Sequence, residues 1–287
     1  MGKILIIGSG PAGISASLYA VRAGMETIIL STGSSSLLKA KEIENYYAYE
    51  NPISGEALLQ EGIKQAQRLG VTILDEEVVG ISFTDKLTLT TRENEYQGDA
   101  VIIATGSARN TPKIKDLVRF EGVGVSYCAV CDGFFYKGKN VGVLGAGDYA
   151  LHEALELLPI AGQVTLLTNG VERSGQLPEG IKLDERPIES FQGDDVLKSI
   201  TFQDGDTLDL SGVFIAQGVA GSADLARKLG AETEGNKIIV DSQMATNIPG
   251  LYAAGDCTGG MLQIAKAVYQ GAEAATSAIK LVREMTR

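Results

Sequence analysis

Two cysteines separated by two residues, Cys128 and Cys131, are the side chains whose type and spacing most directly indicate chemistry. Such a pair can close a small disulfide ring, exchange with the disulfide of a partner protein, or supply half of a zinc site. Zinc would need a second set of ligands, and the remaining candidates, Cys257 and His152, are a poor set. A buried structural pair also stays open. Glycine-rich motifs on both sides of the pair favour a redox-active dithiol.

The first glycine motif, GSGPAG at residues 8–13, lies between an apolar run at 3–7 and an apolar helical stretch at 14–23. The run predicts a buried parallel strand that leads into the helix. In this context Gly8 permits the tight turn, Gly10 lets the backbone approach a pyrophosphate, and Gly13 lets the helix pack on the strand. The phosphates would rest on the helix N-terminus, so the motif predicts dinucleotide binding.

The elements that follow this motif continue an α/β pattern. The strand predicted at 27–30 ends in Ser31-Thr32-Gly33, so hydroxyl or backbone groups must replace the acid expected for a ribose hydroxyl. We predict an amphipathic helix from residues 53–56 to residue 67, and strands over 78–83, 87–91 and 100–106. Near the end, residues 250–256 predict another buried strand, and residues 261–285 a long helix with small residues for close packing.

A second glycine motif, GAGDYA at residues 145–150, follows a strand predicted at 140–144 and opens a helix at 148–158. Two such units predict an α/β fold with two Rossmann-like, three-layer nucleotide-binding domains. The second domain is inserted in the first, because residues 250–256 return to flavin-type features. We therefore expect residues 1–115 and 242–287 to form an FAD-binding domain. Residues 116–241 would form the inserted NAD(P)H-type domain, which carries the cysteine pair.

Composition excludes several classes of protein. Hydrophobic residues make up 44% and charged residues 21% of the chain, as in ordinary globular proteins. Three cysteines are too few for a disulfide-stapled secreted scaffold and suit a reducing cytoplasm, and no apolar run could span a bilayer. The net charge of −11 argues against nucleic-acid binding. Against this acidic background a basic cluster precedes the cysteines, and it is either a solvated crossover or a docking patch for an acidic protein; its members are Arg109, Lys113, Lys115 and Arg119.

Taken together, these motifs resemble the low-molecular-weight thioredoxin reductases over nearly the whole chain. The likeness rests on GSGPAG, IENY at 43–46, the Ala-Thr-Gly turn at 104–106, CxxCDG, the second glycine motif and AAGD at 253–256. The resemblance implies that FAD is bound, with Asp256 holding ribityl or phosphate groups and the backbone at Val78 contacting adenine. It also implies a homodimer. The expected FAD contacts are Gly8, Ser9, Gly10, Pro11, Ala12, Gly13, Thr32, Asn45, Val78, Ala104, Thr105, Gly106, Gly255, Asp256, Gln263 and Ile264.

One departure from the family pattern concerns the electron donor. NADPH-using members carry an arginine cluster after the strand that here covers residues 164–167, and this chain continues with TNGVER. A 2′-phosphate normally needs an arginine fork, and NAD would need an acid at the strand end. The chain therefore looks most like the ferredoxin-dependent flavin thioredoxin reductases, with ferredoxin as donor and thioredoxin as acceptor. The alternatives are an NAD(P)H-dependent reductase, a reductase with a glutaredoxin-like or peroxiredoxin-linked acceptor, and a non-catalytic flavin redox sensor.

The resemblance also assigns roles around the dithiol. Cys131 would be the flavin-side sulfur, Cys128 would attack the thioredoxin disulfide, and Asp132 would donate a proton to the thiolate. To serve both flavin and partner, the inserted domain would rotate about crossovers near 116–122 and 241–245. We expect His152 to be a surface or interface residue and Cys257 to be a small buried residue.

Overall fold

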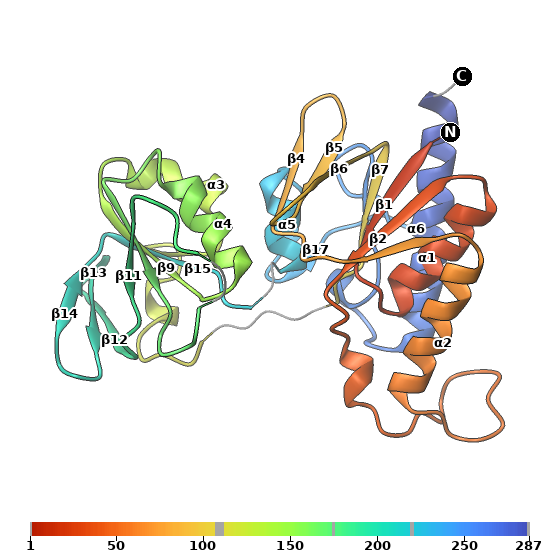
Figure 1. Cartoon of the computed structure of the whole chain (residues 1–287), viewed down its shortest axis with the longest axis horizontal. Helices are drawn as coiled ribbons and strands as arrows, with labels where there is room; N and C mark the ends of the chain where they lie inside the picture. The colour runs from red at the N-terminus through yellow and green to blue at the C-terminus, as the bar shows by residue number, and fades with distance from the viewer. Residues whose placement is uncertain (1, 107–111, 174–175, 219–220, 286–287) are drawn as a thin grey trace. The chain divides into compact units, whose positions relative to one another are not determined.

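The computed structural model describes residues 2–106, 112–173, 176–218 and 221–285, without the side chains of Lys39 and Cys131. The chain forms two compact units (Figure 1). The first comprises Met1–Ala108 with Gly221–Arg287, and the second is Arg109–Ala220. Each unit contains a five-stranded parallel sheet, which confirms the predicted α/β fold with one domain inserted in the other.

The parallel sheet of the first unit has the order β18-β7-β1-β2-β3. Its inner strands are continuous runs of Ile, Leu and Val because both faces of the sheet are covered. In β1, for example, Ile4, Leu5 and Ile6 have no exposed surface. The strands are β18 (Leu251–Ala253), β7 (Ala100–Ile103), β1 (Lys3–Ile7), β2 (Glu26–Ser31) and β3 (Thr72–Asp75), and all neighbours pair in parallel.

Helices α1 (Pro11–Arg22), α2 (Gly55–Arg68) and α6 (Ile264–Met285) lie together on one side of this sheet (Figure 1). Alanines from α1 and α6 meet in the core, and a Cβ at Gly271 would overlap the backbone of Ala12. The small residues of α6 thus permit the close packing that the sequence predicts. An antiparallel sheet of β4 (Gly80–Phe83), β5 (Leu87–Thr90) and β6 (Glu95–Gly98) completes the layers. Within the described ranges no helix, α6 included, has the length and apolarity that a membrane crossing requires.

Residues 221–241 correct the predicted domain boundary. The sequence analysis assigned them to the inserted domain, but they belong to the first unit. Helix α5 (Ser222–Lys228) packs against β4. The Ser222 hydroxyl donates to the carbonyl oxygen of Gly106 at 2.7 Å and lies 2.6 Å from the Thr105 hydroxyl. The inserted unit therefore spans residues 109–220 rather than the predicted 116–241. The prediction failed because it took the strand before Gly255 as the first element after the inserted domain that belongs to the FAD-binding domain.

The second unit repeats the layered plan. Its parallel sheet has the order β11-β10-β9-β15-β8, with α4 (Asp148–Leu157) following β9. An antiparallel sheet of β12 (Ile188–Gly193), β13 (Leu197–Phe202) and β14 (Thr207–Asp209) contributes Phe191 and Phe202 to the core of this unit. The parallel strands are β11 (Ile181–Asp184), β10 (Gln163–Leu167), β9 (Asn140–Leu144), β15 (Gly212–Ile215) and β8 (Val125–Ser126).

Candidate active site

A cavity of about 660 Å³ opens in the first unit where β1 and β7 end and where α1 and α6 begin. This volume falls in the range of pockets that hold organic cofactors, roughly 300–1,000 Å³. Most of the predicted FAD contacts line it, although they come from segments far apart in the sequence. Ser9, Gly13, Thr32 and Val78 do not. Those that do are Gly8, Gly10, Pro11, Ala12, Asn45, Ala104, Thr105, Gly106, Gly255, Asp256, Gln263 and Ile264.

The glycine turn at residues 8–13 has the geometry of a phosphate cradle. Gly8 has φ +104°, and a Cβ there would lie 2.5 Å from the Ala104 carbonyl oxygen. A Cβ at Gly13 would overlap the carbonyl of Gly8, so glycine at 13 is what lets α1 start so close to β1. Gly10 is extended and no side chain caps α1. The free N–H groups of the first helical turn therefore face the cavity and suit a pyrophosphate.

Hydroxyl groups organise the loop after β2 through hydrogen bonds to one another and to the backbone. Ser9 and Ser31 share a hydrogen bond of 2.8 Å between their hydroxyls, and the Gly33 N–H donates to Ser31. Thr32 is exposed, and its hydroxyl lies 3.1 Å from that of Ser34. This arrangement turns the chain so that Ser34, Ser35 and Ser36 line the cavity.

Two predicted flavin contacts meet at another part of the cavity wall. The Asn45 side-chain amide donates to the Gln263 amide oxygen at 2.9 Å, across 218 residues of sequence. The sequence analysis did not name several other lining residues, although the three-serine run directly after a predicted strand was a usable signal. The lining residues it did not assign as FAD contacts are Ser34, Ser35, Ser36, Leu37, Ala40, Glu42, Ile43, Leu262 and Ala267.

The loop that carries Asp256 is fixed from helix α6. Lys266 donates through its ammonium group to the carbonyl oxygens of Gly255, at 2.8 Å, and of Gly259. Gln270 accepts hydrogen bonds from Gly255 N–H and from the Thr258 hydroxyl. Partial burial lowers the pKa of Lys266, and the Asp256 carboxylate acts in the opposite direction. The loop is thus held in place at the cavity wall, with a cation beside the Asp256 carboxylate.

The cysteine pair lies in the second unit, on the short helix α3 (Ala129–Asp132) and directly before it. Cys128 is disulfide-bonded and only 4% exposed. The side chain of Cys131 lies outside the described part of the structure. Three apolar side chains near the pair are exposed: Val130 at 52%, Phe134 at 74% and Phe135 at 70%. The two phenylalanines contact each other edge to face.

Three polar groups hold the backbone and the acid of this short helix. The Ser126 hydroxyl donates to the Asp132 carboxylate at 2.7 Å and accepts from the Cys128 N–H at 3.2 Å. From α4, the Glu153 carboxylate accepts from the Ala129 N–H at 2.8 Å, although Glu153 is only 1% exposed. The carboxylate of Asp132, the predicted proton donor, is therefore tied to the backbone of Cys128 through one serine.

The second glycine motif, at residues 145–150, has the close strand-to-helix turn of a dinucleotide-binding motif. A Cβ at Gly145 would overlap the carbonyl of Ala216, and α4 begins after an extended Gly147 without a side-chain cap. The end of β10 differs from a phosphate site. Thr168 is 1% exposed, and the Asn169 side-chain oxygen accepts from the Ile188 N–H at 2.6 Å. Thr168 is thus enclosed, with no hydrogen-bond partner for its hydroxyl among the described residues, and the Asn169 side chain is engaged by the backbone of Ile188.

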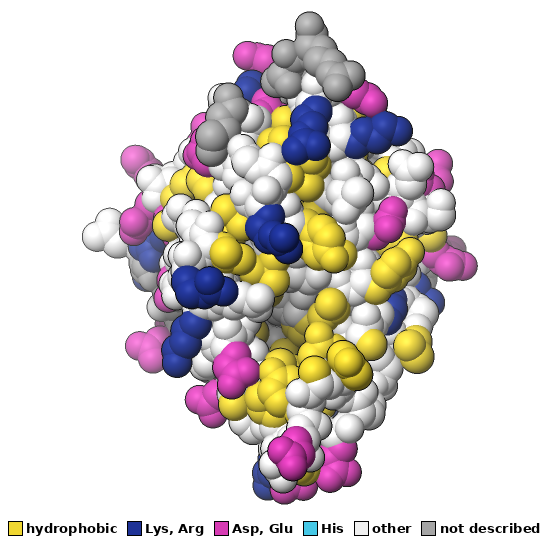
Figure 2. All heavy atoms as spheres, turned by 90° about the vertical axis from the view of Figure 1, so that its right-hand side faces the viewer, with side chains coloured by type: hydrophobic (Ala, Val, Ile, Leu, Met, Phe, Trp, Pro, Cys, Tyr) yellow, Lys and Arg dark blue, Asp and Glu magenta, His cyan; other side chains and the backbone are white. Residues whose placement is uncertain are grey.

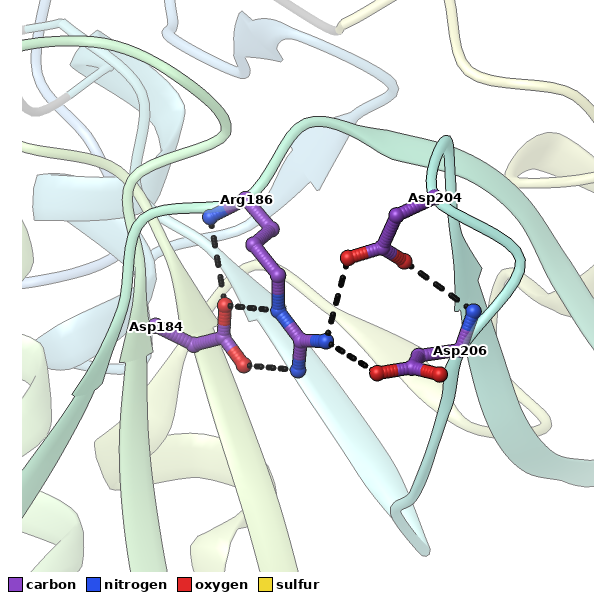
Figure 3. A network of polar contacts seen from close by, with 4 residues as sticks. All are labelled: Asp184, Arg186, Asp204 and Asp206. Carbon is purple, nitrogen blue, oxygen red and sulfur yellow. Dashed lines mark hydrogen bonds and ion pairs between the residues drawn. The ribbon is translucent and has the colours of Figure 1, made fainter.

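The strand paired with β10 is β11, and the arginine that follows it is surrounded by aspartates that balance its charge. Arg186 lies two residues beyond β11 and makes a bidentate contact with Asp184, at 3.0 and 2.8 Å (Figure 3). Its third nitrogen reaches Asp206 at 2.9 Å and Asp204 at 3.3 Å, and its guanidinium lies 4.0 Å from the centre of the Phe202 ring. Asp184 and Asp204 raise the pKa of Arg186, the hydrogen bond to Asp184 contributing most. Arg186 thus joins the end of β11 to the turn between β13 and β14.

Two residues with competing interpretations have ordinary surroundings. Cys257 is a free thiol without exposed surface, and it donates toward the carbonyl oxygens of Ile103 and Ala254. Burial raises the pKa of Cys257 to about 12. His152 is partly exposed on α4, 3.7 Å from Glu156. Both findings agree with the expected roles as a small buried residue and a helix-surface residue.

Comparison with known proteins shows which protein family has this architecture. The model of the pyridine nucleotide-disulphide oxidoreductase family matches residues 2–271. The thioredoxin reductase of Aquifex aeolicus is 35% identical over 273 residues, covering 88% of this chain and 84% of that protein. The thioredoxin reductase of Peptoclostridium litorale is 31% identical and covers 98% and 97%. This chain belongs to the thioredoxin reductase family.

Solved structures of thioredoxin reductases include two informative neighbours. The atypical thioredoxin reductase TRi from Desulfovibrio vulgaris Hildenborough has a TM-score of 0.93 at 41% identity, with 99% of each chain covered. A ferredoxin-flavin thioredoxin reductase from Clostridium acetobutylicum has a TM-score of 0.72 at 30% identity, covering 100% of this chain and 99% of that one.

The cofactor of this thioredoxin reductase is FAD, and the first unit fits it. The cavity has the size of a cofactor pocket, and the glycine turn and uncapped N-terminus of α1 suit its pyrophosphate. Asn45 and Gln263 supply amide groups for a polar ring edge. FAD would therefore lie along a wall built from both halves of the discontinuous domain.

Proposed function

We propose that this thioredoxin reductase takes electrons from reduced ferredoxin rather than from NADPH. The electrons would pass through FAD and the Cys128–Cys131 pair to thioredoxin. The likeness to the ferredoxin-flavin reductase of Clostridium acetobutylicum supports this proposal, while the curated relatives are named simply thioredoxin reductases. The observation that carries it is the end of β10, where a 2′-phosphate would need cationic ligands.

In the described part of the loop after β10, the side chains do not form an arginine cluster, and its one arginine, Arg173, directly follows Glu172. Thr168 is buried, and Asn169 is bonded to the backbone of Ile188. Arg186, the cation after the neighbouring strand, already faces three carboxylates. Glu172 and Glu185 are exposed after β10 and β11. A phosphate with nearly two negative charges normally needs an arginine fork, and a single arginine next to a glutamate does not provide one. This argues against NADPH as the donor.

The dithiol chemistry assigns one task to each residue. Bound FAD would supply the electron pair that breaks the Cys128–Cys131 disulfide. Following the resemblance, Cys131 is the flavin-side sulfur, and Cys128 leaves as the thiolate, which takes a proton from Asp132. In the next step the Asp132 carboxylate takes this proton back, and the Cys128 thiolate attacks the thioredoxin disulfide, which forms a mixed disulfide and releases one thioredoxin thiolate. Cys131 then attacks Cys128, releases reduced thioredoxin and restores the disulfide. Two electrons and two protons pass to thioredoxin in each cycle.

Exposed apolar side chains support a protein as the electron acceptor. Cys128 is nearly buried, so an acceptor must fit closely around the short helix to reach it. Val130, Phe134 and Phe135 present an apolar surface beside this helix. Exposed aromatic residues of this kind are typical of interfaces whose partners cover them transiently. We therefore place the thioredoxin contact at this surface.

A homodimer is the second part of the proposal. The face formed by α1 and α6 carries hydrophobic side chains gathered among lysines and arginines (Figure 2). It includes a groove of about 600 Å³ lined by residues such as Tyr19, Arg22, Ile279 and Lys280. Tyr19 is 53% exposed on it. Sedimentation of the wild type and of Tyr19→Glu tests this: a dimer that Tyr19→Glu weakens supports the interface, and a wild-type monomer refutes it.

Anaerobic stopped-flow measurement of the flavin absorbance tests the donor. Reduced ferredoxin should bleach the flavin rapidly, whereas micromolar NADPH or NADH should not. Rapid bleaching by NADPH would refute the proposal in favour of an NAD(P)H-dependent reductase. Thioredoxin added after reduction should reoxidise the flavin and become reduced itself. A matched variant, Cys128→Ser, should still accept electrons but should not reduce thioredoxin. Flavin reduction without any transfer to a disulfide protein would indicate a redox sensor.

A further inference from the structure

Ser126 is a buried residue at the end of β8, and the chemistry described so far does not use it. It is 5% exposed, and its strand is paired with β15 through Val125 and Ser126. Its hydroxyl accepts from the Cys128 N–H at 3.2 Å and lies 2.7 Å from an Asp132 carboxylate oxygen. The Cys128 carbonyl oxygen is also within reach, at 3.5 Å. Because a hydroxyl has one proton, the shorter contact to the carboxylate takes it.

The short helix α3 cannot by itself fix the position of its acid. It spans only Ala129–Asp132, and its first turn is closed by one bond from the Asp132 N–H to the Cys128 carbonyl oxygen. Ser126, in contrast, belongs to a strand of the parallel sheet. A side chain on this sheet therefore provides a rigid point to which both Cys128 and Asp132 are tied. Glu153 holds the opposite end of the segment through the Ala129 N–H.

We propose that Ser126 is the positioning residue that holds the Asp132 carboxyl group beside Cys128 for proton transfer. This inference rests on the proposed dithiol function. When the reductant donates an electron pair to the disulfide, the S–S bond breaks and Cys128 becomes a thiolate. Asp132 gives its proton to this sulfur and becomes a carboxylate, and the Ser126 hydroxyl stabilises that carboxylate by donating a hydrogen bond. In the reverse direction the same carboxylate takes the proton back when Cys128 must attack.

Kinetic tests separate this role from a general structural one. The flavin is first reduced with dithionite, so the result does not depend on the natural donor, and thioredoxin reduction is followed at several pH values. Ser126→Ala should lower the rate about tenfold with an unchanged thioredoxin KM, and Ser126→Thr should restore most of it. In an Asp132→Asn background, Ser126→Ala should have no further effect, because the two residues act as one unit. Ser190→Ala is the control, since Ser190 is a buried serine of the same unit whose hydroxyl has Gln192 as its partner in the described contacts.

A second measurement needs no acceptor protein. Iodoacetamide alkylation of Cys128 in the reduced enzyme, read by mass spectrometry, follows the thiolate as pH rises. Titratable groups that the structure describes on and around the short helix include the Asp132 carboxylate, Glu153 from α4 and Tyr136 from η3 (Gly133–Tyr136), whose pKa is raised by burial and by Asp132. Asp132→Asn removes a negative charge and should move the alkylation midpoint to lower pH. Ser126→Ala should move it in the same direction by less, and Ser190→Ala should not move it.

The outcomes distinguish this inference from the proposed function. If the dithionite-reduced wild type does not reduce thioredoxin, the proposed acceptor is wrong, and the alkylation profile still decides the role of Ser126. If the alkylation midpoint of Ser126→Ala equals that of the wild type, the inference is overturned. Additive rate losses in the Ser126→Ala, Asp132→Asn double variant would also overturn it.

Discussion

Asn169 allows a quantitative test of the idea that the end of β10 is a structural turn rather than a nucleotide contact. Its backbone has φ +53°, a region that asparagine tolerates and alanine disfavours by about 1 kcal/mol. Its side-chain oxygen accepts from the N–H of Ile188, a residue that is 5% exposed. Leaving such a buried donor without a partner costs about 1–3 kcal/mol. Asn169→Ala should therefore lower the free energy of unfolding of the second unit by roughly 2–4 kcal/mol.

Urea denaturation followed by circular dichroism and by fluorescence measures this change. Asn169→Asp is the matched control, because aspartate keeps both the oxygen acceptor and the tolerance for the left-handed region, so it should stay within about 1 kcal/mol of the wild type. Neither variant should gain flavin reduction by NADPH. If Asn169→Ala proves as stable as the wild type, the turn does not depend on this side chain, and the structural interpretation of β10 fails.

Three further predictions concern the first unit. Gly13→Val should yield protein that loses FAD on desalting, measured by the ratio of flavin to protein absorbance, because its Cβ would overlap the Gly8 carbonyl; retained FAD would contradict the phosphate-cradle geometry. Cys257→Ser should keep thioredoxin reduction within about twofold of the wild type, since the thiol is buried with its pKa raised to about 12; a large loss would instead make Cys257 a redox thiol. Glu76 accepts hydrogen bonds from Thr91, Tyr96 and Asn94, and these bonds lower the pKa of its carboxyl group. Its contribution to the free energy of unfolding is therefore present above the ordinary carboxyl pKa and is lost as pH falls through the lowered pKa. The difference in urea midpoint between wild type and Glu76→Gln should thus be present at neutral pH and decrease as pH falls through the lowered carboxyl pKa, and a difference independent of pH would refute the assignment.

The fold and the cofactor were within reach of the sequence because they depend on local signals. Residues 3–7 and 140–144 are apolar runs ended by glycine, and both are strands with the predicted bounds. The domain boundary was not, because α5 joins the first unit through contacts with β4 and Gly106, which no local pattern reveals. The Asn45–Gln263 bond likewise joins segments 218 residues apart. Ser126 was missed for a related reason: its hydroxyl becomes significant only once α3 has folded back over it.

The second unit has a structural role that does not involve a nucleotide. Helix α4 would receive phosphates at its N-terminus in a dinucleotide-binding protein. The same helix carries Glu153, whose buried carboxylate holds the Ala129 N–H at the start of the dithiol helix. The sheet that supports α4 also carries Ser126 at the end of β8. The absence of an arginine cluster directly after β10 leaves both anchors intact, because β10 contributes neither of them. A reductase with a different electron donor would therefore still need the whole second unit, because this unit holds the segment that carries the disulfide in position.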